Sequence, residues 1–427
     1  LSPLLKRLHL RRPADVGADV AGQKKGGTAV KAGYGCKLFG AQQVFTGISD
    51  GVTLLHSVVG CNFGSMGYHF TACDMSDVRQ SCTVLSDSDI VFSGEDSFRL
   101  ALENMKELYR PRQIFALQGC VSDMIQDDLA AVAGEFTRET GIPVLVLEAA
   151  GYRGSFQDGY EAAALALAGL MKPAGEAPGP VPKINLLGLG ADDYRLKADI
   201  DAIEGLLAGK AELGCVLGKC TLAELERAPE AALNLCFGRG TALAKKMCRV
   251  YGIPYAVLDY PYGLTGAKRL WKVLEERLGL DYSRESRAFR EDTGRELKRV
   301  YSYLEDFLNV PVSVLACGSR SGGMASFLGR ELGFRVEVAA AREDTRELED
   351  FYDRVRQGES AMLFASSFEQ ELGDELGIPV LRIDYPVFDR VVLSDRPYVG
   401  VKGTLCLVED ILNEIFHGRT LKGGLYQ

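Results

Sequence analysis

The sequence predicts an α/β protein with three Rossmann-like domains, each a parallel sheet flanked by helices, and a cleft between them. Short continuous apolar runs alternate with amphipathic helical patterns along most of the chain, which is typical of parallel strands buried on both faces. The chain has 427 residues, too many for one compact core. A segment rich in Pro and Gly, residues 172–183, interrupts the alternation, which restarts after it.

The first series of elements precedes that segment. Apolar runs predict strands at 52–59, 89–94, 113–119 and 142–149. Helical periodicity predicts helices at 95–109, 122–141 and 155–171. The series therefore has the order of a β-α-β-α domain.

Two further series follow. In the second, strands are expected at 184–190, 211–218, 231–238 and 253–260, with helices from about 193, at 241–252 and at 266–279. A charged helical stretch near 284–308 leads into the third, with expected strands at 312–318, 334–340, 360–366 and 378–386. Its helices are expected at 324–333, within the charged stretch that follows 340, at 368–373 and near 403–416. We therefore predict an N-terminal extension (1–30), a first domain (31–182), a middle domain (183–283) and a C-terminal domain (284–427).

Bulk properties exclude several classes of partner. The net charge is −9 and the pI about 5.3, so no basic footprint for nucleic acid is present. No apolar run approaches the roughly 18–20 residues that span a bilayer. The N-terminus lacks the apolar core of a secretion signal, and it starts without Met, so a few residues are expected to be missing or processed. These features predict a cytoplasmic protein with no membrane partner and without a disulfide framework.

Three of the eleven cysteines follow glycine in turn-like segments: Cys36, Cys61 and Cys120. Thiolates bind iron–sulfur clusters, and glycine lets the backbone approach a cluster closely. Three thiolates are one too few for an all-cysteine cube, so a fourth ligand would come from another chain, another residue type or nowhere. The spacing alone favours scattered buried thiols, which is also how we interpret Cys248, Cys317 and Cys406.

A resemblance changes this balance. The following stretches together resemble nitrogenase component 1, from about residue 33 to 416: "GYGCKLFGA", "LLHSVVGC", "SDIVFSGEDSFRLALENM", "GCVSDMIQDDLAAV", "IPVLVLEAAGYRGSFQDGYEAA" and "YGIPY". The superfamily includes both subunits of the molybdenum–iron protein, a cofactor-assembly scaffold and nitrogenase-like reductases of tetrapyrroles. The resemblance implies that Cys36, Cys61 and Cys120 hold an iron–sulfur cluster, either [4Fe–4S] or P-cluster type, at the interface with a second subunit.

Cys236 is the second candidate of the same resemblance. It ends a buried strand before a helix that leads to "YGIP", as the cofactor-binding cysteine of the nitrogenase α subunit does. The resemblance therefore allows a second metallocofactor at Cys236, and a core thiol is the alternative. No histidine lies between residues 70 and 416, so the α subunit's second cofactor ligand is missing. The segment 377–403 resembles the β subunit instead, which argues against dinitrogen reduction.

The remaining candidates have structural interpretations beside functional ones. Cys73 and Cys82 are possible replacement cluster ligands or buried thiols. Cys215 and Cys220 form a Cys-x4-Cys pair that is more often chance than a metal site. His56 is expected to be structural, and Asp127 and Asp128 are expected to be surface or capping groups. Other open candidates are the possible charge partners of Cys236, namely Arg239, Lys245 and Lys246, and two glycine-rich strand ends, 188–193 and 317–323.

These inferences lead to two hypotheses. The first is an enzyme: the catalytic iron–sulfur component of a nitrogenase-like, ATP-dependent reductase. The chain has no Walker motif, so its electrons would come from a separate P-loop iron–sulfur ATPase. The second is a non-catalytic scaffold for maturing a metallocofactor. In either case a homologous subunit or a second copy of the chain is the expected partner.

Overall fold

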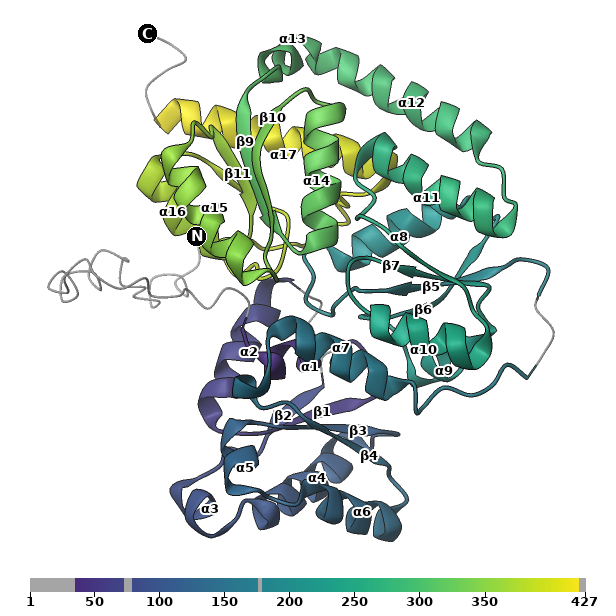
Figure 1. Ribbon diagram of the computed structural model, residues 1–427, viewed down its shortest axis with the longest axis vertical. Helices are drawn as coiled ribbons and strands as arrows, with labels where there is room; N and C mark the ends of the chain where they lie inside the picture. The colour runs from purple at the N-terminus through teal and green to yellow at the C-terminus, as the bar shows by residue number, and fades with distance from the viewer. Residues whose placement is uncertain (1–34, 73–78, 176–178, 422–427) are drawn as a thin grey trace, which may run out of the picture. The chain divides into compact units, whose positions relative to one another are not determined.

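The computed structural model describes residues 35–72, 79–175 and 179–421, which belong to one compact unit. Within these residues the strands form three four-stranded parallel sheets (Figure 1). In each sheet the strands, numbered by their order along the chain, lie side by side in the order 2-1-3-4. The predicted fold class is therefore confirmed, and the three sheets share one strand topology.

The first sheet has the order β2 (Gln80–Cys82), β1 (Val52–His56), β3 (Ile114–Gln118) and β4 (Val144–Glu148). Its helices are α1 (Lys37–Phe45), α2 (Val59–Ala72), α3 (Asp87–Phe92), α4 (Glu95–Tyr109), α5 (Cys120–Ile125), α6 (Leu129–Thr140) and α7 (Phe156–Leu167), with the 3-10 turn η4 (Gly151–Arg153).

Two predicted elements of this domain are wrong. The strand predicted at 89–94 is helix α3, because Ser86 and Asp89 form a capping box that starts a helix. The single helix predicted at 122–141 is divided into α5 and α6. Gln126 ends α5 in the left-handed conformation (φ 60°), and the Asp128 side chain caps α6.

The second sheet has the order β6 (Glu212–Val216), β5 (Lys183–Leu187), β7 (Leu233–Cys236) and β8 (Tyr255–Val257). Its helices are α8 (Leu196–Leu207), α9 (Leu222–Glu226), α10 (Thr241–Tyr251) and α11 (Gly263–Leu278), with η5 (Ala228–Glu230).

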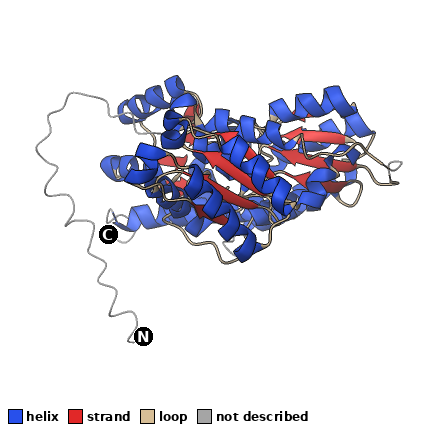
Figure 2. Cartoon of the chain, turned by 90° about the horizontal axis from the view of Figure 1, so that it is seen from below, coloured by secondary structure: helices blue, strands red, loops and turns tan. Residues whose placement is uncertain are grey.

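The third sheet has the order β10 (Arg335–Ala341), β9 (Pro311–Ala316), β11 (Met362–Ala365) and β12 (Val380–Arg382). It is preceded by α12 (Ser283–Leu297), η6 (Lys298–Val300), α13 (Tyr301–Leu304) and η7 (Glu305–Phe307). Its other helices are α14 (Gly318–Arg330), α15 (Thr345–Gln357), η8 (Ser367–Glu369), α16 (Gln370–Leu376) and α17 (Gly400–Leu421). Figure 2 shows strands in red among blue helices.

The hydrophobic cores cross the predicted domain boundaries. One core joins α1 and α7 to residues of the middle sheet, including Cys215 and Cys236. Another joins the middle and C-terminal sheets, and α17 packs on α8, α11 and α12. In the part of the chain that the structure describes, no helix combines the length and apolarity needed to cross a membrane.

Candidate functional site

The candidate site lies where the strand order of the first sheet reverses, at the carboxyl ends of β1 and β3. Open parallel sheets bind ligands at such switch points. β1 leads through Ser57 into α2, whose first turn contains Cys61. β3 leads through Gly119 into α5, whose first residue is Cys120. Cys61 therefore lies inside a helical turn and not at a strand end as expected.

Cys36 comes from a different element but reaches the same place. It is the N-cap residue of α1 and forms an isolated antiparallel bridge with Ser155. A Cβ built on Gly151 would lie 2.9 Å from the Sγ of Cys36 and 3.4 Å from the Sγ of Cys120. The Gly151 N–H also donates to the Sγ of Cys120 at 3.1 Å. Gly151 thus brings the backbone of η4 against two thiols at once.

All three predicted cysteines are half-buried and lie at helix N-termini. Negative charge is favoured at this end of a helix. Burial raises the pKa of Cys36, the N–H groups of Leu38 and Phe39 oppose this, and the Cys120 and Cys61 thiols raise the pKa further. The Cys36 and Cys120 sulfurs thus lie beside Gly151, and Cys61 lies in the first turn of the helix that follows β1.

The donor set is of the type that binds an iron–sulfur cluster, whose usual ligands are thiolates. Among residues 35–72, 79–175 and 179–421, no three His, Cys, Asp or Glu groups converge tightly enough to hold one metal ion. A cluster of several irons needs ligands that are further apart, and thiolates are its usual ligands. The bare Gly151 and its N–H to sulfur bond fit such a site, because a side chain there would fill the space beside both thiols.

Asp123 fixes the loop that carries Gly151, and sequence reasoning did not single it out. Its carboxylate, in α5, accepts hydrogen bonds from the Tyr152 hydroxyl and from Arg153 Nε at 2.8 Å. Asp123 is buried, whereas Arg153 is half exposed. The bonds join the helix that begins at Cys120 to the turn that contacts its sulfur.

His56 and Asp127 form a buried pair beside this site. His56 Nε2 lies 3.1 Å from Asp127 Oδ2, and Gly94 N–H donates to Oδ1 at 2.9 Å. Burial lowers the pKa of His56, although Asp127 opposes the shift. Burial raises the pKa of Asp127, but the Gly94, His56 and Ser hydrogen bonds outweigh it and the net shift is downward. Asp127 is therefore a buried anchor for β1, not the surface or capping group expected.

Cys236 lies in a different environment. Its side chain is fully buried in the core shared by the first and middle domains, among residues such as Leu187, Leu243 and Met247. Burial, followed by the charge of Glu161, raises the pKa of its thiol to about 12. A cofactor at Cys236 was expected to come with a pKa lowered by Arg239, whereas this pKa is raised. The residues here do not fit a resident metallocofactor, and they favour the core interpretation that the sequence left open.

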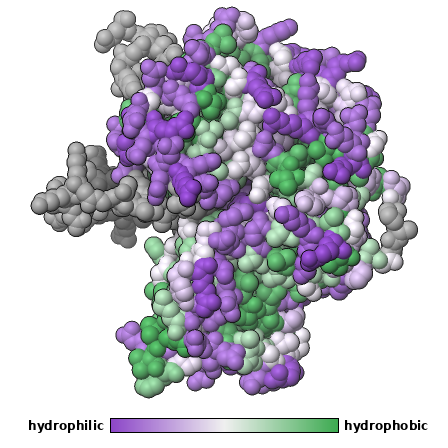
Figure 3. Space-filling model, viewed as in Figure 1, coloured by the Kyte–Doolittle hydropathy of each residue, from purple (hydrophilic) through white to green (hydrophobic). Residues whose placement is uncertain are grey.

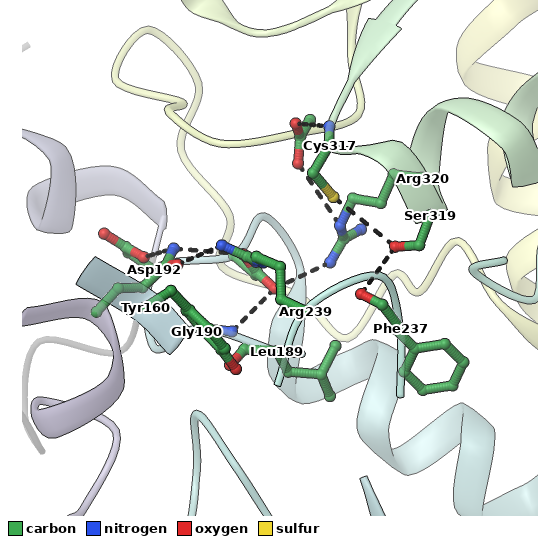
Figure 4. A network of polar contacts seen from close by, with 12 residues as sticks. Tyr160, Leu189, Gly190, Asp192, Phe237, Arg239, Cys317, Ser319 and Arg320 are labelled. Atoms are coloured by element: carbon green, nitrogen blue, oxygen red, sulfur yellow. Dashed lines mark hydrogen bonds and ion pairs between the residues drawn. The ribbon is translucent and has the colours of Figure 1, made fainter. Parts of the chain in front are cut away.

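Arg239 instead belongs to a buried network that joins α1, the segments after β5 and β7, and α14 (Figure 4). It donates to Gln43 Oε1 of α1 at 2.7 Å and lies 3.3 Å from Asp193 Oδ1. Arg320 of α14 lies 3.4 Å from Asp193 Oδ2 and 3.6 Å from Asp384 Oδ1. All four charged side chains are at most 3% exposed. Where the sequence predicts a cleft, opposite charges from the middle and C-terminal sheets are therefore in contact.

The other candidates have these positions. Cys82 ends β2 beside β1, whereas Cys73 lies outside the described residues. Cys215 and Cys220 are buried, and their mutual contact and burial raise the pKa of Cys220. Asp128 is confirmed as a capping group.

The glycine-rich stretch 317–323 contains the start of α14, and the chain's own carboxylates accept hydrogen bonds from the backbone N–H groups there. Cys317 N–H donates to Asp384 and Gly318 N–H donates to Glu343. Lys245 is exposed on α10.

The fold and the site define a class: a protein of three parallel α/β sheets with three cysteines at the switch point of the first. The family described as nitrogenase component 1 type oxidoreductase matches residues 36–416, and the chain belongs to this family.

The known relatives include nitrogenase subunits and cofactor biosynthesis proteins. The chain is 26% identical to the nitrogenase molybdenum–iron protein alpha chain of Methanothermobacter marburgensis, over 90% of this chain and 87% of that protein. It is 31% identical to the nitrogenase iron–molybdenum cofactor biosynthesis protein NifE of Methanosarcina barkeri, over 52% of this chain and 50% of that protein. The solved structure "Nitrogenase Cp1 at pH 6.5" is 19% identical, covers 92% of this chain and 95% of its own, and has a TM-score of 0.75.

Proposed function

We propose that the chain is the iron–sulfur component of a nitrogenase-like, ATP-dependent reductase. In this proposal Cys36, Cys61 and Cys120 hold a cluster at the interface with a second subunit. Electrons arrive from a separate P-loop iron–sulfur ATPase. The observation that carries the proposal is that Cys36 and Cys120 lie against the bare Gly151, at the switch point that also receives Cys61.

A bound iron–sulfur cluster supplies one-electron transfer. The chain's own residues supply the environment. The Gly151 N–H donates to the Cys120 sulfur, and such bonds to ligand atoms orient them and tune potential. Apolar residues of the shared core, among them Leu38 and Leu55, lie behind the half-buried Cys36 and Cys61 and keep water from that side.

Exposed apolar side chains beside the site support a protein partner. In α2, which contains Cys61, Val59 is 58% exposed and Phe63 is 79% exposed. In α3, Val91 is 72% exposed and Phe92 is 84% exposed, and α3 packs beside α5. Figure 3 shows this apolar surface over α3 in green at the lower left. Exposed patches of this kind typically mark interaction sites.

The test is anaerobic purification with iron analysis and electron paramagnetic resonance. We expect Cys61→Ala and Cys120→Ala to lose the cluster, with Cys248→Ala, a half-buried cysteine of α10, as the matched control. Reduction by a partner ATPase should require ATP. Full iron in both cysteine variants would overturn the cluster assignment, and equal reduction rates without ATP would overturn the electron route.

A second candidate function is maturation of a metallocofactor. Similarity to cofactor biosynthesis proteins favours it. The two functions differ in turnover. A reductase oxidises and reduces its cluster repeatedly with a substrate, whereas a scaffold releases a metal product to a partner protein.

A further inference from the structure

A fourth half-buried thiol, Cys82, lies at the same edge of the first sheet as the three predicted ligands. β2 runs parallel to β1, and Cys82 pairs in register with Leu55. Because β1 ends one residue later, at His56, Cys82 lies level with the start of the segment that leads to Cys61. Cys36, Cys61 and Cys82 all pack as half-buried residues on the same hydrophobic cluster.

Ser57 connects Cys82 to the other side of the site. The Cys82 thiol donates to the Ser57 carbonyl at 3.5 Å. On its other side, Ser57 lies against the residue before Cys120, since a Cβ at Gly119 would be 2.6 Å from Ser57 Oγ. Ser57 therefore lies between Cys82, at the end of β2, and Gly119, which precedes Cys120. Cys61 follows Ser57 by four residues in the sequence.

The backbone after Cys82 is arranged around its sulfur. Val84 has a φ of 55°, an uncommon conformation for a β-branched residue. Its N–H donates to the Cys82 Sγ at 3.4 Å, as the Gly151 N–H does to Cys120. The Cys82 sulfur is thus held between two backbone groups, the Val84 N–H and the Ser57 carbonyl.

We propose that Cys82 is the fourth thiolate of the site, so that this chain alone provides Cys36, Cys61, Cys82 and Cys120 to one [4Fe–4S] cluster. This inference rests on the proposed iron–sulfur function. Four thiolates are the usual ligand set of a cubane. A partner subunit then covers the cluster through the apolar residues of α2 and α3 but contributes no ligand.

Iron stoichiometry provides the test. Native mass spectrometry of the anaerobically purified chain should show about four irons on a single chain, the content of one cubane. Cys82→Ala should lose about one quarter of that iron or more and change the electron paramagnetic resonance signal. Cys248→Ala should leave both unchanged. Because Cys82→Ala also removes the thiol donor to Ser57, its thermal midpoint is measured together with that of Cys82→Ser, which keeps a donor.

The outcomes separate this inference from the function on which it rests. Full iron and an unchanged signal in Cys82→Ala, with iron lost in Cys61→Ala, would overturn the role of Cys82 and leave the three-cysteine site. Iron bound only to chain pairs would overturn it in the same way. Full iron in both variants would overturn the cluster itself. If Cys82→Ala fails to fold, an altered signal in folded Cys82→Ser supports the ligand role, and an unchanged one overturns it.

Discussion

Gly40 and Gly159 lie where the backbones of α1 and α7 touch. A Cβ on Gly40 would lie 1.8 Å from the carbonyl oxygen of Phe156, and a Cβ on Gly159 would lie 1.9 Å from that of Lys37. Both neighbours are backbone atoms, so a side chain at either position forces the helices apart. Because α1 begins directly after Cys36, this contact sets how deeply the Cys36 thiol enters the site.

Gly159→Ala should therefore destabilise the fold by about 1–3 kcal/mol, the usual cost of overpacking, and should speed iron loss to a chelator. Gly294→Ala is the matched control. Gly294 lies inside α12 with nothing within 4 Å of its would-be Cβ, so alanine there should be neutral or stabilising. Thermal melts of both variants check this. Equal melting temperatures in the two would contradict the close contact.

Asp123→Asn should loosen the turn that contains Gly151. The variant loses the charge that holds Arg153 Nε at 2.8 Å. Since Arg153 is half exposed, the stability cost should be only about 1 kcal/mol, but the off-rate of iron should rise because the Gly151 N–H no longer holds the Cys120 sulfur firmly. Glu148→Gln, which removes a more exposed partner of Arg153 at 3.7 Å, is the control. Identical iron off-rates in the two variants would sink this explanation.

Cys236→Ser should cost about 1–3 kcal/mol, because it buries a hydroxyl without a partner in an apolar environment. Cys236→Ala should cost less. Neither change should alter the iron bound at Cys36, Cys61 and Cys120. Metal analysis beside thermal melts checks both points. A loss of metal or of activity without a loss of stability would show that Cys236 is a ligand after all.

Asp192→Asn should change how stability depends on pH. Burial raises the pKa of Asp192 from 3.8 to about 7, although the Gln43 side chain opposes the shift. Between these values the unfolded chain has lost the proton that the folded chain keeps, so this group's contribution to stability falls as pH rises from 3.8 to about 7. The stability of the variant relative to wild type should rise over the same window. Asp201→Asn, at an exposed position of α8, should show no such trend in melts recorded across the window.

Local patterns predicted most of the strands but not the edge of the first sheet. β3 and β4 are continuous apolar runs, which is why 113–119 and 142–149 were assigned correctly. β2 has only three residues, all half-buried, so it has no periodicity. The run Ile90-Val91-Phe92 has the composition of a strand, yet it lies exposed in α3. The Ser86–Asp89 capping box was the sequence signal for a helix start.

The sequence predicted only those site residues whose type, cysteine, binds the cluster directly. Gly-Cys pairs in turn-like segments, together with the family resemblance, singled out Cys36, Cys61 and Cys120. The contacts that support them join residues remote in sequence, such as His56 with Asp127 and Gln43 with Arg239. No local pattern encodes those pairs, because the parallel topology alone brings the segments together. Likewise, the contact of Gly151 with two thiols required the structure.

The core that joins the first and middle domains has a consequence for the order of events during synthesis. The ribosome completes Cys120 more than a hundred residues before it completes Cys236. Within this interval α1 can pack on α7, but the residues that β7 and α10 contribute to the shared core and the Gln43–Arg239 bond are still missing. The three thiols are therefore synthesised before their packing is complete, and the last part of that packing comes from a segment that contributes no thiolate to the site.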